Sequence, residues 1–327
     1  MIKLATIGTS QICESFIGGA KLTGRYELWG AYSRDKKKAL AFAEKHGFIN
    51  TFDSLEKMAE CGDIDAVYIA SPNVCHFPQS KLFLENGIHV LCEKPITTNA
   101  TEYETLKKIA DENNLIYMEA IIPPHTSHHK NVKSAISSLS SVTSARIDFC
   151  QRSSKFDAFL RGENPNIFNM SLHAGALMDL GVYCVYAAVD FFGVPKNIYA
   201  KSAFLSNGAD GSGAVVFEYD NMNAVITYAK TAQSRIGSEI TGSDATLTIN
   251  SIGQYSGIVL TDKDGNKTEI AGQYTKEELM SGEAGRFADF IENIENNKNE
   301  YRESQKMCLN VHRCMDIIKE KAAIKYD

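Results

Sequence analysis

Short apolar runs alternate with amphipathic stretches through the first part of the chain. Residues 2–7 form an apolar run, and an amphipathic stretch follows to about residue 22. Further apolar runs predict buried strands at residues 28–32, 66–70, 89–92 and 115–118. The stretches between them predict helices at residues 35–46, 79–86 and 99–113. Strands that alternate with helices form a parallel, doubly wound sheet of the Rossmann type, which we assign to residues 1–120.

The second part of the chain has a different pattern, in which strand-like runs follow one another with turn residues between them. The predicted strands are residues 142–150, 197–205, 213–219, 224–231, 238–250 and 257–260. Helices are predicted at residues 175–193 and 284–296 and in a final stretch whose apolar stripe is Met307, Val311, Cys314 and Ile318. This pattern predicts an α+β domain with a large, open, mostly antiparallel sheet over residues 121–327.

The run from residue 175 to 194 is apolar enough to raise the question of a membrane span. It contains Asp179 and Asp190. Charged residues at the depth of a bilayer are costly, so the run is interpreted as a buried helix and no membrane partner is expected.

Composition narrows the class of protein. The chain has 327 residues with 44% hydrophobic and 23% charged residues, which is typical of ordered globular domains. Its net charge of −6 argues against a nucleic-acid partner. The eight cysteines form no C-x-x-C pair and the N-terminus lacks the pattern of a signal peptide, so we expect reduced thiols and a cytoplasmic protein.

The first strand, the turn after it and the next helix make the opening unit of a dinucleotide fold. The turn carries a degraded glycine fingerprint, with residues Gly8, Thr9, Ser10, Gln11 and Ile12. Small residues remain where the backbone must approach a pyrophosphate at the helix N-terminus, so these five residues are predicted to bind the cofactor. A tight turn without a ligand is the alternative.

Ser33 and Arg34 follow the second strand, where NAD-binding folds usually carry an acid for the ribose 2′-hydroxyl. A carboxylate would repel a 2′-phosphate, whereas a hydroxyl and a guanidinium can bond it. NADP is therefore preferred over NAD. The alternative is that Arg34 is a surface residue and the preference is loose.

Polar or charged residues follow three further strands of the predicted parallel sheet. They are Ser71, Pro72, Asn73 and His76; then Glu93 and Lys94; and finally Glu119. Ligands of open parallel sheets bind outside the carboxyl ends of the strands, so all are predicted to line the cofactor site. Lys94 in particular is delivered to a bound small molecule, although an exposed turn pair is the usual fate of such a dipeptide.

In this order, the motifs Gly8-Thr9-Ser10-Gln11-Ile12, Ser71-Pro72-Asn73-x-x-His76 and Glu93-Lys94-Pro95 resemble the glucose–fructose oxidoreductase/inositol dehydrogenase (Gfo/Idh/MocA) family. Glu119-Ala120 and the prolines after it are similar to the dihydrodiol/xylose dehydrogenase branch. The resemblance covers essentially the whole chain. It implies an NAD(P)-dependent oxidoreductase in which Lys94 lies beside the nicotinamide and the substrate carbinol.

A second set of catalytic residues is predicted on the apolar helix. Asp179 and Tyr183 are four residues apart and share one face. A buried Asp must be paired, and Lys94 is the candidate partner. The family pattern Gly-Gly-x-x-x-Asp-x-Gly-x-His matches here, with Tyr183 in the place of its last His. An adjacent ammonium favours the phenolate of a tyrosine, so Tyr183 is the predicted general base, with Asp179 orienting it or Lys94.

Four residues are predicted to contact the substrate: His125, Arg152, His173 and Tyr183. His125, His128 and His129 have a spacing that suits a metal, but no carboxylate or cysteine accompanies them and no metal is expected. Arg152 lies in a polar stretch, residues 151–170, which is either a lid or a surface excursion. For His173, a helix-entry residue without a role is an equal alternative.

The favoured function is hydride transfer between a nicotinamide and a carbinol or carbonyl of a sugar, polyol or related diol. A non-catalytic NAD(P)-binding regulator of the same fold is the alternative, and a structural protein without a ligand is the third. An open sheet with one uncovered face often packs against another subunit, so a homodimer or homotetramer through the C-terminal sheet is predicted.

Overall fold

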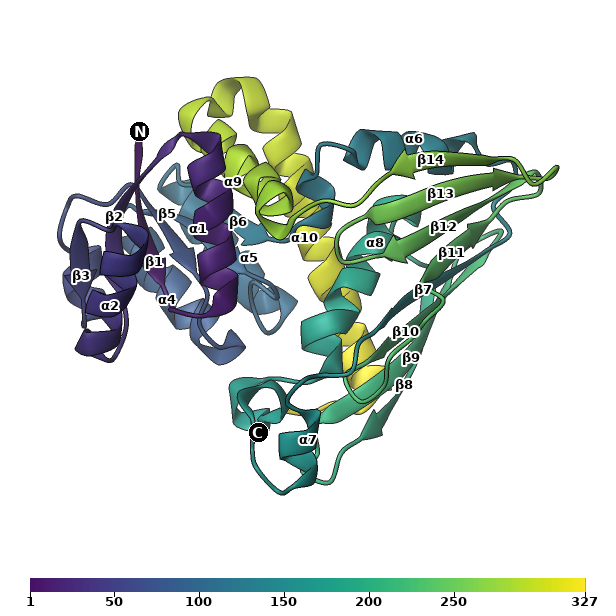
Figure 1. Cartoon of the computed structure of the whole chain (residues 1–327), viewed down its shortest axis with the longest axis horizontal. Helices are drawn as coiled ribbons and strands as arrows, with labels where there is room; N and C mark the ends of the chain where they lie inside the picture. Colours follow the sequence, from purple (N-terminus) through teal and green to yellow (C-terminus); the bar gives the residue numbers. More distant parts are fainter. Residues whose placement is uncertain (327) are drawn as a thin grey trace. The chain divides into compact units, whose positions relative to one another are not determined.

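The computed structural model describes residues 1–326 of the chain and divides it into two units (Figure 1). The first contains residues 1–122 and 275–306, and the second contains residues 123–274 and the segment from residue 307 onward. The predicted division at residue 120/121 therefore needs one correction. Residues 275–306 belong to the first unit, because the helix formed by Lys276–Glu292 packs against the helix formed by Gln11–Thr23.

The first unit is built on a parallel sheet of six strands in the order β3-β2-β1-β4-β5-β6. This is the strand order of the Rossmann fold. The strands are β1 (Ile2–Ile7), β2 (Tyr26–Tyr32), β3 (Asn50–Phe52), β4 (Ala66–Ile69), β5 (His89–Glu93) and β6 (Tyr117–Ala120). The predicted parallel, doubly wound sheet is thus confirmed. The short strand β3 was not predicted because it has only three residues.

Helices cover the sheet of the first unit. They are α1 (Gln11–Thr23), α2 (Lys36–His46), α3 (Leu55–Ala59), α4 (Asn73–Glu85), α5 (Ala100–Glu112) and α9 (Lys276–Glu292). The beginning of α4 was predicted as a turn and the helix from residue 79, but α4 already begins at Asn73 and contains Pro78. The motif residues Asn73 and His76 are therefore in its first turn.

Helices α1 and α9 pack closely because the contact face of α1 carries two glycines (Figure 1). A Cβ atom on Gly18 would lie 2.8 Å from the side chain of Glu277, and one on Gly19 would lie 2.8 Å from the backbone of Met280. Thr275 and Glu278 form a capping box that begins α9. The long helix α10 (Ile294–Lys321) follows, and the boundary between the two units falls within it.

The second unit contains the predicted large, mostly antiparallel sheet. Its eight strands have the order β14-β13-β12-β11-β7-β10-β9-β8, and the pair β7–β10 is parallel. The strands are β7 (Ser144–Cys150), β8 (Asn197–Phe204), β9 (Asp210–Glu218), β10 (Asn223–Ala229), β11 (Ser238–Thr241), β12 (Ala245–Ser251), β13 (Ser256–Asp262) and β14 (Lys267–Ala271). The run 238–250 was predicted as one strand, but it turns at Gly242 and forms the hairpin β11–β12.

One face of this sheet packs against the apolar helix, which consists of a π-helical turn, η4 (Leu177–Gly181), and α8 (Val182–Phe192). The stretch Met170–Phe192 is long and apolar enough to cross a membrane, yet 78% of its most apolar window is buried inside the protein. The interpretation as a buried core helix is confirmed.

The remaining elements of the second unit are short. They are η1 (Pro123–His125), α6 (His129–Ser138), α7 (Phe156–Leu160), η2 (Asn166–Phe168) and η3 (Met170–Leu172). The stretch 151–170, predicted as a polar loop, is anchored by α7 and by the mutually packed rings of Phe156, Phe159 and Phe168. It is therefore an ordered part of the unit. In α10, the stripe residues Val311, Cys314 and Ile318 are buried as predicted.

Candidate active site

The turn between β1 and α1 has the geometry of a phosphate-binding turn. Gly8 has a φ of +115°, which L side chains rarely adopt. A Cβ atom there would stand 2.7 Å from the backbone oxygen of Ala70, so only glycine fits. Ser10 is the N-cap residue of α1 and its side chain makes no capping hydrogen bond. Thr9 completes this turn, and Gln11 and Ile12 begin α1. The N-terminus of the 13-residue helix α1 directly follows this glycine turn. The free backbone N–H groups at such a helix N-terminus can bind the pyrophosphate of a dinucleotide.

Ser33 and Arg34 lie at the carboxyl end of β2, as predicted. The Ser33 N–H donates to the carbonyl oxygen of Phe52 at 3.2 Å, which aligns it with β3. Burial raises the pKa of Cys75 in the first turn of α4, and the charge of Arg34 opposes this rise. The Arg34 guanidinium is therefore near enough to Cys75, in the helix that follows β4, to interact with it electrostatically.

His76 connects two predicted cofactor-binding turns. Its Nδ1 lies 2.8 Å from the carbonyl oxygen of Pro95, and its Nε2 lies 2.9 Å from that of Ser71. The ring is only 1% exposed. Ser71 in turn donates to the side chain of Gln79 at 2.7 Å. These contacts make His76 a clamp between the turns, while its direct contact with a cofactor stays a prediction.

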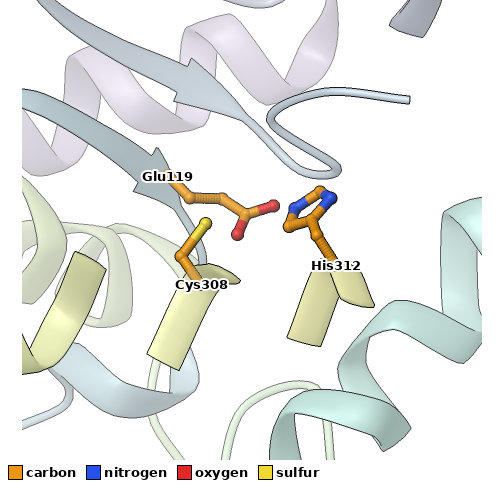
Figure 2. A group of neighbouring side chains, drawn as sticks. All are labelled: Glu119, Cys308 and His312. Carbon is orange, nitrogen blue, oxygen red and sulfur yellow. The ribbon is translucent and has the colours of Figure 1, made fainter. Parts of the chain in front are cut away.

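Lys94 directly follows β5. The buried carboxyl groups of Glu93 and Glu119 make hydrogen bonds that fix the chain before and after it. Glu93 accepts a hydrogen bond from the phenol of Tyr68. Burial raises the pKa of Glu93, and the Lys94 ammonium opposes the rise. Glu119, in β6 (Figure 2), accepts from the backbone N–H of Ile96 at 2.8 Å. The turn that carries the lysine is thus fixed from both neighbouring strands.

Sequence reasoning missed a further buried carboxyl group in the first unit. Glu283, on α9, is fully buried, and neither of its oxygens has a hydrogen-bond partner within residues 1–326. Burial raises its pKa well above the usual range, and the nearby Glu93 adds to this rise. Glu283 also acts on Tyr68, whose pKa is raised by burial and by the charges of Glu93 and Glu283. Burial therefore favours the protonated forms of Glu93, on β5, and Glu283, on α9.

In the second unit, Asp179 is paired with an ammonium, but the partner that the structure supplies is Lys230. Lys230 directly follows β10, and its side chain is 8% exposed. Lys94, the partner expected from the sequence, belongs to the first unit, so its approach to Asp179 and Tyr183 stays a prediction. The signal for Lys230 was present, because a lysine directly after an apolar strand is the pattern that singled out Lys94.

The π-helical turn that carries Asp179 is capped by an acid from β9. The Leu177 N–H donates to Asp210 Oδ2 at 2.7 Å. A Cβ atom on Gly175 would stand 1.9 Å from Asp210 Oδ1, so only glycine leaves room for this carboxyl group. Burial raises the pKa of Asp210 to about 7, against the hydrogen bond from Leu177. Asp210 was not predicted, since it lies 31 residues from Asp179 in the sequence (210 − 179).

Tyr183, four residues after Asp179, lies in the first turn of α8. Its ring meets that of Phe149 edge to face, with centroids 5.6 Å apart. Phe149 comes from β7, so the sheet fixes the direction of the phenol. Asp179 lies within the widened π-helical turn η4 and Tyr183 lies just after it, so the two residues are not on one regular α-helix. Such turns are frequent at functional sites.

The three histidines expected to form one cluster have separate surroundings. His125 ends η1. His128 stacks on Tyr274, with ring centroids 4.6 Å apart. His129 Nε2 lies 2.8 Å from Asp190 Oδ2, so a carboxylate does accompany it, from α8. That carboxylate also accepts from Tyr255 at 3.1 Å and pairs with Lys133. The network ties α6 to α8, and a substrate contact by His125 stays a prediction.

The other two predicted substrate residues also have partners in the second unit. The guanidinium of Arg152 binds both oxygens of Asp157, at 2.6 and 3.1 Å, and lies over the ring of Phe156. His173 has a φ of 52° and stacks on Tyr326, with ring centroids 4.9 Å apart. Their substrate contacts stay predictions.

Cys308 and His312 are four residues apart on α10 and share a face of that helix (Figure 2).

Comparisons with known proteins agree with this architecture. Residues 2–121 match the model of the oxidoreductase family with an NAD-binding Rossmann fold, and residues 133–248 match the GFO/IDH/MocA C-terminal domain. The chain is 36% identical over 328 residues to the scyllo-inositol 2-dehydrogenase (NADP(+)) of Bacillus subtilis, which covers 100% of this chain and 98% of that protein. It is 30% identical over 217 residues to a D-xylose 1-dehydrogenase (NADP(+)) of Haloferax volcanii, covering 66% and 65%.

Solved structures share the fold. A 3-ketoreductase from Actinomadura kijaniata in complex with NADP and TDP-benzene has a TM-score of 0.84 at 21% identity, covering 98% of this chain and 97% of that one. A levoglucosan dehydrogenase in complex with NADH and levoglucosan has a TM-score of 0.82 at 18% identity, with the same coverage. With both domain models and a full-length relative matched, the chain belongs to the Gfo/Idh/MocA family and is an NAD(P)-dependent oxidoreductase.

Proposed function

We propose that the protein is an NADP-preferring dehydrogenase whose substrate is a cyclic polyol, a sugar or a related diol. The observation that carries the proposal is the full-length similarity to a scyllo-inositol 2-dehydrogenase that uses NADP(+). The D-xylose and dihydrodiol dehydrogenases among the relatives favour the same substrate class. The pair Ser33 and Arg34 supports the coenzyme preference, because a guanidinium can bond a 2′-phosphate.

Residues of the first unit would hold the coenzyme at the carboxyl edge of the sheet. The Gly8 turn and the N-terminus of α1 fit the pyrophosphate, and Ser33 and Arg34 fit the adenosine ribose. The turns at Ser71 and Lys94 fit the nicotinamide half. The nicotinamide, when bound, supplies the hydride acceptor or donor. The groups of the protein bind and orient the substrate and move its proton.

Proton transfer is the task that the chain itself must perform. The Tyr183 phenol would accept the proton of the substrate hydroxyl, or return it in reduction. The Lys94 ammonium would stabilise the charge that develops on the same oxygen, and an adjacent ammonium favours the phenolate. Asp179 would orient these groups. General-base catalysis at neutral pH needs such tuning, because an unperturbed tyrosine titrates at about pH 10.

The test is a screen of inositols, aldoses and diols with both coenzymes, read at the nicotinamide absorbance. We expect turnover with NADP(H) and a higher kcat/KM than with NAD(H). Lys94→Ala should lower kcat by about 10²–10⁴-fold, the usual contribution of such a group, while leaving the fold and NADPH binding largely intact. Normal turnover in this variant would refute the role of Lys94. Tight NADPH binding without turnover on any substrate would favour a regulator.

We also propose that the open face of the eight-stranded sheet is the surface through which subunits associate. Tyr199, Val216 and Val225 lie side by side across β8, β9 and β10 on this face. Tyr199 is 59% exposed and Val225 41%. Arg146 and Glu239 continue the same row on β7 and β11. A row with an apolar part and a charged pair suits an interface between copies.

The eight free cysteines fit a reducing compartment, so we place the protein in the cytoplasm.

A further inference from the structure

Asp179 has an uncommon partner for a residue so close to a predicted proton carrier. Among residues 1–326, Lys230 is the one lysine that is buried, and its Nζ forms an ion pair with Asp179 Oδ2. Lysine is almost never fully buried unless it is paired. The π-helical turn presents Asp179, and the end of β10 presents Lys230. The pairing therefore links the turn before Tyr183 to the sheet.

The backbone around Lys230 is fixed on both sides. Its N–H donates to the carbonyl oxygen of Gly211 at 2.9 Å, and its own carbonyl oxygen accepts from the N–H of Ser153 at 2.9 Å. Gly211 lies in β9. A Cβ atom there would lie 2.9 Å from the side chain of Leu205 and 3.0 Å from that of Thr231, so a glycine lets these two side chains pack against the β9 backbone. Lys230 thus projects from a rigid base toward the turn that carries Asp179.

We propose that Lys230 is a positioning residue for the reaction: it holds Asp179 in place and cancels the charge of that carboxylate beside Tyr183. This inference rests on the proposed function, in which Tyr183 carries the proton. A carboxylate one turn away disfavours a phenolate, and so it opposes the effect of the Lys94 ammonium. With Lys230 in place, Asp179 orients its neighbours as half of a neutral pair and adds no net negative charge beside the Tyr183 phenol.

The other ionisable groups around the η4 turn come from four elements. β9 supplies Asp210, which caps the turn, and β10 supplies Tyr228. β7 supplies Asp148 and Cys150, and α8 supplies Cys184, Tyr186 and Asp190. Burial raises the pKa of the Cys184 thiol and of the Tyr228 phenol well above their usual values, so both stay neutral. Asp190 is compensated by His129 and Lys133 at the other end of α8.

The test is the pH dependence of kcat in the full-length protein with its best substrate and NADP(H). We expect Lys230→Met to lower kcat at pH 7 by about tenfold or more and to move the pH of half-maximal kcat upward by about one unit. The Kd for NADPH should stay within about twofold, because that ligand binds residues of the other unit. Lys230→Arg, which keeps the charge, should retain the wild-type midpoint. Asp179→Asn/Lys230→Met should return the midpoint toward that of the wild type.

A matched control is Lys133→Met, which removes the other lysine that pairs with an Asp of the same helix. It should lower the melting temperature but leave the midpoint unchanged. If Lys230→Met does not fold, Lys230→Gln decides, since it keeps a hydrogen-bond donor without the charge. An unchanged kcat and midpoint in a folded, uncharged variant would overturn the inference while Lys94→Ala and Tyr183→Phe remain impaired. If Tyr183→Phe turns over normally, the proposed function itself fails.

Discussion

Two buried carboxyl groups of the second unit show how surroundings set opposite behaviour for the same side chain. Burial raises the pKa of Asp210 to about 7, because hydrogen bonds from backbone N–H groups, among them that of Leu177, do not replace the lost water. Burial also acts on Asp190, but hydrogen bonds and charges from His129 and Lys133 outweigh it and lower the pKa. The stability of the protein should therefore depend on pH with opposite signs at these positions.

We predict that Asp210→Asn becomes progressively more favourable as the pH rises. The folded protein keeps a proton on Asp210 from pH 4 to about pH 7 that the unfolded chain has lost, so the wild type loses stability over this window. The shift of about three units corresponds to about 4 kcal/mol at most. Urea unfolding of both proteins at pH 5, 6, 7 and 8 should show a difference that grows and then levels off.

Asp190→Asn serves as the comparison of opposite sign. The stability that Asp190 contributes is present above its unfolded pKa and is lost as the pH falls through its lowered folded pKa, so this variant should be impaired from pH 7 down to pH 4 and should approach the wild type only in more acidic solution. A pH-independent difference for Asp210→Asn would contradict the account of its burial.

At the scale of elements, the apolar helix is positioned by an acid that the sequence places far away. The η4 turn begins under the carboxyl group of Asp210, and Gly175 is the residue that leaves space for it. Any side chain at residue 175 must displace the cap, and with it the turn that carries Asp179.

We predict that Gly175→Ala destabilises the protein by about 1–3 kcal/mol, the usual cost of overpacking, and lowers kcat. Chemical denaturation and steady-state kinetics measure the two effects. Gly285→Ala in α9 is the control: a Cβ atom there meets nothing within 4 Å, so helix propensity should make it neutral or stabilising. Equal stability of both variants would show that the Asp210 carboxyl group moves aside without cost.

The same scale shows what the sequence can reveal. The strands of both sheets were predictable wherever apolar residues recur, but β14 is polar along most of its length and α6 lacks a strong start signal. The Thr275–Glu278 capping box marks the beginning of α9 in the sequence, whereas the predicted helix begins only at residue 284. The lysine after the apolar strand β10 marks Lys230 as a candidate, but no local pattern shows that its partner is Asp179, which lies 51 positions away. The candidate residues could therefore be chosen, but not their contacts.

At the scale of the whole molecule, the exposed row on the eight-stranded sheet is the surface through which we propose that copies of the chain associate. We predict that Val225→Glu lowers the oligomer mass measured by light scattering in size-exclusion chromatography. A charge in the apolar part of the row would lose its water on association. Ile49→Glu, at a residue of the first unit that is 56% exposed, should leave the mass unchanged. A wild-type protein that is monomeric at micromolar concentration would exclude this interface.

The return of residues 275–306 to the first unit has a consequence for biosynthesis. The glycine face of α1 and the buried surface around Phe16 and Tyr68 are completed by α9, whose residues leave the ribosome after the whole of the large sheet. Until then the nascent first unit lacks the helix that covers this apolar strip. The first unit can therefore complete its core only after residues 275–306 have been synthesised.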